Sequence, residues 1–240
     1  MDGQRTCEVL MELRHVTKRY EMGTETVTAL EDVSLKIRSG EILCLLGASG
    51  SGKSTFLNLA AGLEKPTKGE IRVGNILLHR LDEQALALFR QKNVGFIFQS
   101  YQLLPMLTAV ENVALPLVFR GQGKRKREQL ARRALEEVGL SGLENRRPSQ
   151  MSGGQQQRVG IARALAGSPR LLFADEPTGN LDSRTTREIM GLMEKTVRRG
   201  GQTLIIVTHD PFVAGFADRT VVIGDGRIIS DKRKGETDEA

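Results

Sequence analysis

The stretch "GASGSGKST", residues 47–55, constrains the fold of this chain more than any other feature. It matches the pattern G-x-x-x-x-G-K-[ST], and it lies between the apolar run "EILCLL" (41–46) and the helix-forming segment "KSTFLNLAAG" (53–62). Backbone N–H groups that turn inward around phosphates need glycines, here Gly47, Gly50 and Gly52. We therefore expect a buried strand, a phosphate-binding loop and a helix in succession. A glycine-rich turn that arose by chance is the alternative.

The residue types within this loop suit a phosphate chain and its Mg²⁺. Lys53 would reach the β- and γ-phosphates, and the Ser54 hydroxyl would ligate Mg²⁺. The N-terminus of the following helix adds its own partial positive charge. The candidate ATP-binding residues of the loop are Gly47, Ala48, Ser49, Gly50, Ser51, Gly52, Lys53, Ser54 and Thr55.

Strand and helix signals alternate along the chain, which predicts an α/β fold. The order implies a P-loop core with a mainly parallel sheet, an N-terminal antiparallel β region and an inserted α-helical subdomain. Strands are expected at 9–20, 33–37, 41–46, 94–99, 171–175, 203–208 and 219–226, with a hairpin at 69–78 and a turn-rich connector at 21–32. Helices are expected at 53–62, 82–92, 126–140 and 183–200, with 100–165 mostly helical.

These elements predict one domain over residues 9–230. Residues 9–99 and 167–230 would form the core and the β region, and about 100–166 the helical subdomain. The last residues, 231–240, are expected to be a charged, flexible tail.

Polar side chains follow several of the predicted core strands. Asp175 and Glu176 end the strand in "LLFADEP", where Asp175 would hold Mg²⁺ through water and Glu176 would polarise an attacking water. A strand-end turn is the alternative, because Asp-Glu-Pro is good turn chemistry. His209 and Gln99 end two other strands, and parallel strand ends converge on one edge of a sheet. They are predicted to be a γ-phosphate sensor and a metal or water ligand, with a structural role as the alternative.

Composition bounds the class of protein. The chain has 240 residues, 39% of them hydrophobic and 27% charged, which is typical of a globular protein. No apolar run approaches the length of a membrane span, and the N-terminus does not resemble a secretory signal. Two cysteines, Cys7 and Cys44, allow neither a disulfide framework nor a cysteine metal site, so a reducing compartment is inferred. Cys44 lies in an apolar strand and is predicted to belong to the core.

The net charge of +6 is unevenly distributed, with basic runs at 124–133 and 231–234. Such runs can bind nucleic acid or anionic lipid. The sequence favours a solvated helix face and a charged tail instead, because no aromatic residues interleave the basic run.

The stretch "MSGGQQQRVGIARAL", residues 151–165, has no paired nucleophile and base and no metal ligands. Here the sequence closely resembles the nucleotide-binding subunits of ABC transporters, over about residues 9–230. The motifs stand in that family's order: the P-loop, the glutamine loop at Gln99, the signature "SGGQQQR" from Ser152, "LLFADE", "GNLD" (179–182) as the D-loop, and the switch His209.

The resemblance implies roles for further residues. The signature residues Ser152, Gly153, Gly154 and Gln155 would act on the ATP held by a partner subunit, in a head-to-tail homodimer with two ATP molecules. Asp182 in the D-loop would lie at the dimer seam. Tyr20 would stack on adenine, with an ordinary strand-end tyrosine as the alternative. Met151 stands where the family usually has leucine, a volume-conserving change. Implied for catalysis are Glu176, His209 and Lys53, with Ser54, Gln99 and Asp175 on Mg²⁺.

The resemblance narrows to the lipoprotein-releasing and macrolide-exporter group, from "VGFIFQSYQLLPMLTAVENVALPL" (94–117), the insertion after Tyr20 and "EPTGNLD". It implies an Mg²⁺-dependent ATPase, the motor subunit of a membrane complex for lipoprotein release or macrolide or peptide export. Closure of its homodimer would drive a separate permease with an extracytoplasmic domain, from the cytoplasmic face of the inner membrane. The alternatives are a soluble ABC-type ATPase of translation, DNA repair or iron–sulfur assembly, and a nucleic-acid-binding module. No specific nucleic acid is expected, and the sequence leaves the substrate open.

Overall fold

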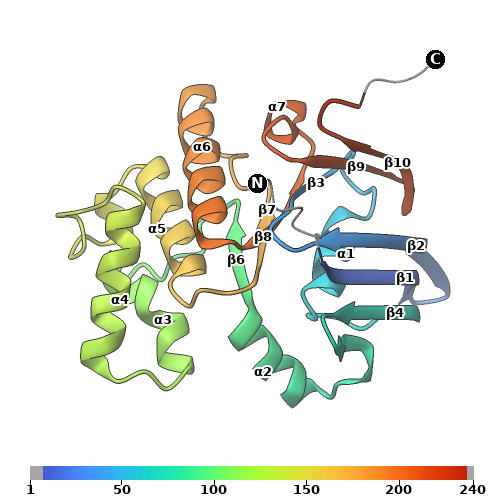
Figure 1. Ribbon diagram of the computed structural model, residues 1–240, viewed down its shortest axis with the longest axis horizontal. Coiled ribbons are helices and arrows are strands. Elements are labelled where there is room, and N and C mark those ends of the chain that lie inside the picture. Colours follow the sequence, from blue (N-terminus) through green and yellow to red (C-terminus); the bar gives the residue numbers. More distant parts are fainter. Residues whose placement is uncertain (1–7, 237–240) are drawn as a thin grey trace, which may run out of the picture. The chain divides into compact units, whose positions relative to one another are not determined.

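The computed structural model describes residues 8–236 of the chain, which form an α/β fold (Figure 1). It divides into unit 1, Met1–Leu86 with Val207–Ala240, and unit 2, Ala87–Ile206. The elements of unit 1 are β1 (Val9–Met22), β2 (Glu25–Arg38), β3 (Ile42–Leu46), α1 (Lys53–Ala60), β4 (Lys68–Val73), β5 (Ile76–Leu77), η1 (Leu78–Arg80), α7 (Pro211–Ala214), β9 (Arg219–Gly224) and β10 (Arg227–Arg233). The elements of unit 2 are β6 (Val94–Phe98), α3 (Ala109–Phe119), α4 (Lys124–Glu137), η2 (Pro148–Gln150), α5 (Gly153–Leu165), β7 (Leu171–Asp175) and α6 (Ser183–Gly200). The division falls within α2 (Glu83–Asn93) and β8 (Thr203–Thr208).

Unit 1 contains an antiparallel sheet with the strand order β2-β1-β4-β5 (Figure 1). The prediction of a turn-rich connector at 21–32 is wrong, because β2 begins at Glu25 and pairs with the end of β1, for example Val27 with Tyr20. The segment is rich in Thr and Val, which favour strands, but much of it is exposed and therefore lacks the apolar alternation that marks a half-buried strand. The turn itself is confined to residues 23–24, where Gly23 has a φ of 64°.

The second group of strands in unit 1 has the order β10-β9-β3, with β3 and β9 parallel and β9 and β10 antiparallel. Cys44 is fully buried within β3, as predicted, whereas Cys7 lies outside the described residues. The predicted tail at 231–240 begins too early, because β10 continues to Arg233. Asp231 accepts two hydrogen bonds of 2.5 Å from the Arg219 guanidinium of β9, a bidentate pair that fixes the strand end. Residues 237–240 lie outside the described residues.

Unit 2 combines the strands β8-β7-β6 with three helices, α3, α4 and α5, that pack on one another. β6 and β7 are parallel, with Phe98 opposite Asp175, so the polar residues that follow these strands share one edge. Because α5 also packs on β6, both strands fall in the same unit as the helices, whereas the sequence set the helical subdomain at about 100–166. No helix among residues 8–236 is long and apolar enough to cross a membrane.

Candidate functional site

The predicted strand, loop and helix around residues 47–52 are present in unit 1, where β3 leads through the loop into α1. Lys53 is buried, and its ammonium donates hydrogen bonds to the carbonyls of Gly47 at 2.8 Å and Ala48 at 2.7 Å. The lysine therefore lies inside the curve of the loop. Ser54, the next residue of α1, is exposed, so its hydroxyl is open to a ligand.

The loop has three features that fit a bound phosphate chain. Gly52 has a φ of 104°, and a Cβ there would lie 2.5 Å from the Ala29 carbonyl oxygen, so only glycine fits. Gly52 is also the N-cap of α1 and gives no side-chain hydrogen bond to the first turn, which leaves those N–H groups to a ligand. The buried hydroxyl oxygen of Ser51 has no hydrogen-bond partner among the described residues. A phosphate chain would satisfy these donors.

Tyr20 lies on β1, and its hydroxyl donates to the Glu64 carboxylate at 2.8 Å. Lys18 stands 4.9 Å from the centre of the tyrosine ring and 3.0 Å from the same carboxylate. Burial, followed by this hydrogen bond to Glu64, raises the pKa of Tyr20, so the hydroxyl stays protonated near neutral pH. The ring is thus held by a network that includes a cation over one face, and its stacking on adenine stays a prediction.

His209 belongs to unit 1 and follows β8, where its side chain is exposed. The backbone on either side of it is fixed: Thr208 is buried, and Asp210 caps α7 by accepting a hydrogen bond from the Phe212 N–H at 2.8 Å. A short helix cap therefore holds the exposed imidazole at the strand end.

The other predicted strand-end residues lie in unit 2. Asp175 is the last residue of β7, and Glu176 follows it with a φ of 45°, an uncommon backbone conformation for a residue with a side chain. Such strain persists where surrounding structure enforces it and is frequent at functional sites. Gln99, after β6, is hydrogen-bonded to Asn180 in both directions. The Gln99 side-chain amide donates to the Asn180 side-chain oxygen at 3.3 Å, and the Asn180 side-chain amide donates to the Gln99 backbone carbonyl at 3.2 Å. The predicted glutamine loop and D-loop are therefore in contact.

The signature stretch forms the N-terminus of α5 and lines a cavity of about 410 Å³. Ser152 is the N-cap: its hydroxyl accepts a hydrogen bond from the Gln155 N–H at 3.3 Å, and the Gln155 side chain accepts one from the Ser152 N–H at 3.0 Å. A Cβ on Gly154 would lie 2.9 Å from the Thr185 side chain, so α5 approaches α6 closely at this point. The residues that line the cavity are Ser152, Gly153, Gly154, Gln155, Arg158, Asn180, Leu181, Asp182, Thr185 and Glu188.

Asp182, which also lines this cavity, is the N-cap of α6. Its carboxylate accepts hydrogen bonds from the Arg184 N–H at 3.0 Å, the Thr185 N–H at 2.9 Å and the Thr185 hydroxyl at 2.6 Å. These bonds, the Thr185 hydroxyl first, lower the pKa of Asp182. The signature and the D-loop, which are 27 residues apart as counted from Gln155 to Asp182, thus line one cavity. Each motif contributes a helix N-cap, Ser152 for α5 and Asp182 for α6.

Two residues of this region were not singled out from the sequence. Gln157 is fully buried, and its amide donates to the Pro177 carbonyl at 2.5 Å, which ties α5 to the turn after Glu176. Asn180 is the partner of Gln99 described above. Both lie inside recognised motifs, but their partners are 20 and 81 residues away, so no local pattern indicates them.

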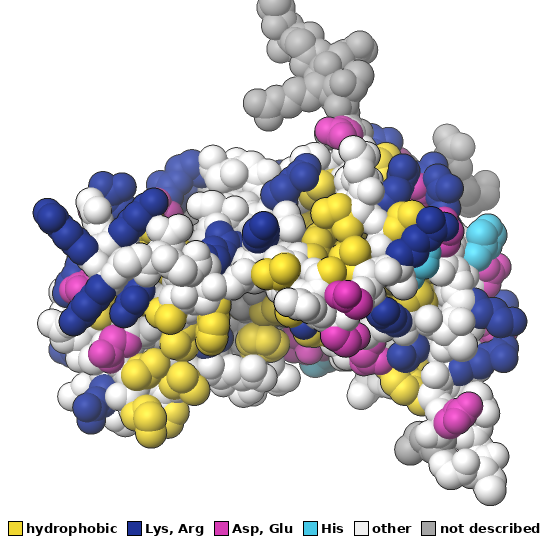
Figure 2. All heavy atoms as spheres, turned by 90° about the horizontal axis from the view of Figure 1, so that it is seen from below, with side chains coloured by type: hydrophobic (Ala, Val, Ile, Leu, Met, Phe, Trp, Pro, Cys, Tyr) yellow, Lys and Arg dark blue, Asp and Glu magenta, His cyan; other side chains and the backbone are white. Residues whose placement is uncertain are grey.

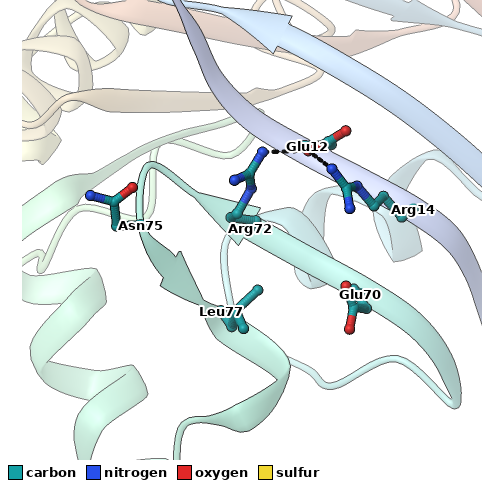
Figure 3. A pocket seen from close by; sticks show the side chains of 6 residues that line it. All are labelled: Glu12, Arg14, Glu70, Arg72, Asn75 and Leu77. Carbon is teal, nitrogen blue, oxygen red and sulfur yellow. Dashed lines mark hydrogen bonds and ion pairs between the residues drawn. The ribbon is translucent and has the colours of Figure 1, made fainter.

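A second cavity of about 310 Å³ lies on the antiparallel sheet of unit 1 (Figure 3). Glu12 of β1 is buried there, and its carboxylate accepts hydrogen bonds from Arg14 at 2.9 Å and from Arg72 of β4 at 2.7 Å. These bonds, the one from Arg14 first, outweigh burial and lower the pKa of Glu12 to about 2. The network joins two strands of the sheet and includes none of the predicted site residues.

Comparison with known proteins places this arrangement in a family. The family model described as ABC transporter matches residues 30–179. The chain is 46% identical to MJ0796, an uncharacterised ABC transporter ATP-binding protein of Methanocaldococcus jannaschii, over 93% of this chain and 97% of that one. A structure of that cassette, a dimer in a post-hydrolysis state bound to ADP and Pi, has a TM-score of 0.86 at 43% identity, and covers 94% of this chain and 100% of that one.

Two further relatives differ in how much of their length this chain covers. The chain is 48% identical to the macrolide export ATP-binding/permease protein MacB 1 of Yersinia pestis, over 92% of this chain but only 34% of that protein. It is 44% identical to an uncharacterised ABC transporter ATP-binding protein of Bacillus subtilis, over 93% of this chain and 97% of that one. On the match over most of its length, this chain belongs to the ABC transporter family, as an ATP-binding cassette.

Proposed function

We propose that this chain is the ATP-hydrolysing motor subunit of a membrane complex, in which nucleotide-driven closure of a homodimer acts on a separate permease. The dimeric, ADP- and Pi-bound cassette with 43% identity supports the dimer and the hydrolysis. The macrolide exporter, whose remaining two thirds lie outside the match, supports a permease partner. The function we assign to the complex is lipoprotein release, or macrolide or peptide export. The ATPase subunit would act at the cytoplasmic face of the inner membrane.

The residues of unit 1 would bind the nucleotide. In this proposal the loop at 47–55 holds the phosphates, Lys53 neutralises their charge, and Tyr20 stacks on adenine. His209, held at the end of β8, would donate a hydrogen bond to the γ-phosphate. The buried, unpartnered Ser51 hydroxyl and the uncapped α1 support a phosphate ligand.

Glu176 would accept the proton of the attacking water, the general-base step of the reaction. Its positive φ of 45° supports a functional role, because backbone strain of this kind is frequent at functional sites. Ser54, Gln99 and Asp175 supply a hydroxyl, an amide oxygen and a carboxylate, the hard oxygen donors that suit Mg²⁺. When bound, Mg²⁺ would neutralise negative charge on the phosphates of the nucleotide.

The observation that carries the dimer is the cavity at the N-terminus of α5. Its walls offer the Ser152 hydroxyl, the backbone of two glycines and a helix N-terminus, all of which suit an anion. The cation among its lining residues, Arg158, is paired with Glu188 at 3.6 Å. We infer that a second copy of the chain brings a phosphate-binding loop to this cavity. Asp182, on the cavity wall, would then lie at the dimer seam.

The segment after Gln99 would contact the permease. Asn112 of α3 is fully buried. Its side-chain oxygen accepts a hydrogen bond from the Leu104 N–H at 2.8 Å, and its side-chain amide donates to the carbonyls of Leu104 and Leu107 at 3.1 Å each. These bonds fix a loop on which Leu104 and Met106 are 46% and 76% exposed. A rigid loop that presents apolar side chains fits a protein contact.

The first test is the Glu176→Gln variant. It should bind ATP with unchanged affinity and form a stable dimer with ATP and Mg²⁺, while ATP turnover falls roughly 100-fold or more, since the general base is lost. Near wild-type turnover would remove Glu176 as the base. Equal turnover with Mg²⁺ and with excess chelator would contradict the Mg²⁺ dependence.

The second test identifies the partner. Glu176→Gln protein is used with ATP and Mg²⁺ to capture partners from detergent-solubilised membranes, and mass spectrometry identifies them. A four-helix permease with a large outer domain supports the motor function, and Met106→Asp should lose it while isolated ATPase activity is kept. Capture of only soluble factors, ribosomes or nucleic acid would leave the ATPase chemistry but refute the transport function.

A further inference from the structure

We infer that the end of α3 and the first turn of α4 form a surface that binds anionic lipid bilayers. We define the 118–126 surface by its exposed members, Val118, Phe119, Lys124, Arg125 and Lys126. The inference goes beyond the proposed function, in which the permease and not this chain contacts the membrane. It requires neither nucleotide nor a second copy of the chain.

The apolar part of the surface is exposed but rigid. Phe119 is 72% exposed and Val118 43%, although Leu117 beside them is buried. The Gln91 side chain donates a hydrogen bond to the Phe119 carbonyl. The next residue, Arg120, donates to the Gln91 carbonyl at 2.7 Å, to the Lys92 carbonyl at 3.0 Å and to the Gly167 carbonyl. The backbone is therefore fastened at this point, and the phenylalanine ring is held in solvent rather than on a loose end.

The basic part of the surface is unfavourable for its own helix. Lys124, Arg125 and Lys126 occupy the first turn of α4, where the helix dipole disfavours cations, and that turn has no acidic residue. Among the ion pairs within residues 8–236, none includes these three side chains, whereas Arg132 on the same helix pairs with Glu128 at 2.9 Å. Three cations that raise the free energy of the helix and lack internal partners indicate an anionic partner outside the chain.

The combination of exposed cations and an exposed aromatic ring fits a bilayer surface best. Lysine and arginine bind anionic headgroups, while an aromatic side chain enters the boundary between headgroups and acyl chains. On the side of the molecule formed by α3 and α4, Figure 2 shows hydrophobic side chains gathered close to a group of Lys and Arg side chains. Single-stranded nucleic acid would need several stacking aromatics, but Phe119 is the only aromatic residue in 118–133.

Sedimentation with vesicles tests the inference on the full chain, without nucleotide. Wild-type protein should bind vesicles of equal parts phosphatidylcholine and phosphatidylglycerol, should not bind pure phosphatidylcholine, and should be released as NaCl rises. Each basic residue near an anionic surface contributes about fivefold to partitioning, so Lys124→Gln/Arg125→Gln/Lys126→Gln should bind roughly 100-fold more weakly.

The matched control removes the same charge elsewhere. Lys232→Gln/Arg233→Gln/Lys234→Gln takes three cations from the other basic run and should stay within about threefold of wild type, because those residues lie outside the surface. If both triple variants lose binding equally, net charge and not the 118–126 surface is responsible, and the inference is wrong. Both variants should keep their ATP turnover, so the outcome is independent of the proposed function.

A fluorescent reporter tests the aromatic residue directly. The chain contains no tryptophan, so Phe119→Trp is a unique probe, and its emission should shift to the blue on phosphatidylglycerol vesicles. Ile229→Trp, at a residue of β10 that is 69% exposed, should show no shift. Unchanged Phe119→Trp emission on bound vesicles would overturn the inference. The inference would also be wrong if wild-type protein did not bind the vesicles but bound single-stranded RNA through the same three cations.

Discussion

At the scale of single residues, Glu12 shows how a buried charge is stabilised without taking part in the candidate site. Its carboxylate is nearly inaccessible, and the two guanidiniums that bond it come from its own strand, β1, and from the neighbouring strand β4 (Figure 3). A carboxylate buried without such partners would be strongly destabilising. Its neutralisation should therefore weaken the attachment of β4 to β1.

The first prediction concerns the variant Glu12→Gln. At pH 7 it should lose about 1–2 kcal/mol of unfolding free energy, a value kept small because both arginines are half exposed. The pKa of Glu12 is lowered from 4.5 to about 2, so its contribution is complete above about pH 4.5 and disappears as pH falls toward 2. Urea unfolding at pH 7, 4 and 3 should show the difference between wild type and variant shrinking with acidity.

The control for this prediction lies in the same cavity. Glu70 also lines it but is 46% exposed, so Glu70→Gln should change the unfolding free energy by less than about 0.5 kcal/mol. A difference between wild type and Glu12→Gln that stays constant from pH 7 to pH 3 would show that the carboxylate charge is not what stabilises the sheet.

At the scale of elements, the signature stretch is first of all a helix start. Ser152 closes a capping box on α5, in the same way that Thr108 does on α3. Asp and Asn cap helices about as well as Ser, and the negative charge of Asp is also stabilised by the positive N-terminal end of the helix dipole. A charged and an uncharged capping residue at position 152 can therefore separate the structural role of Ser152 from its proposed functional role.

The second prediction uses this separation. Ser152→Asp and Ser152→Asn should both keep the unfolding free energy within about 0.5 kcal/mol of wild type. Ser152→Asp should lose ATP turnover roughly 100-fold or more, because its carboxylate would repel the γ-phosphate, and Ser152→Asn should lose much less. Thermal unfolding and ATP turnover are measured on both variants. Equal turnover in the two would mean that no phosphate approaches this helix end.

The elements also show what local sequence encodes. The range expected for α6, 183–200, is the observed one, since Asp182 caps its start and Gly201, with a φ of 67°, ends it. β7 and β8 are observed at the expected residues as well, because continuous apolar runs mark strands buried on both faces. The sequence pattern does not indicate the first half of β2 or any of β10. Both are largely exposed, and pairing with a neighbouring strand rather than an apolar pattern makes them strands.

At the scale of the whole molecule, the sequence predicted the family and the α/β fold, because the glycine and acidic motifs are local and stand in a specific order. It did not predict that Ser152 and Asp182 line one cavity, or that Gln99 bonds Asn180, since these contacts depend on how α5, α6 and β6 pack. The strained φ of Glu176 is likewise enforced by the surrounding fold and has no local signal.

The third prediction concerns two copies of the chain acting together. If the cavity at Ser152 serves a partner's nucleotide, Ser152→Arg should abolish ATP turnover while the monomer still binds ATP, since Lys53 and its loop are untouched. Lys53→Ala should be inactive because it loses nucleotide binding. In a heterodimer of the two variants, the intact loop of one copy faces the intact signature of the other, so one complete site is restored.

Mixing the two inactive proteins in equal amounts therefore distinguishes a site shared between copies from a site within one copy. Random pairing makes about half of the dimers mixed, each with one of two sites intact, so roughly a quarter of wild-type turnover should return if the sites act independently. Co-purification of differently tagged Lys53→Ala and Ser152→Arg proteins is the control for subunit exchange, because it detects mixed dimers whichever copy supplies the signature. If the first mixture stays inactive while this control shows exchange, the signature acts on the ATP of its own chain, and the cavity at Ser152 needs no second copy.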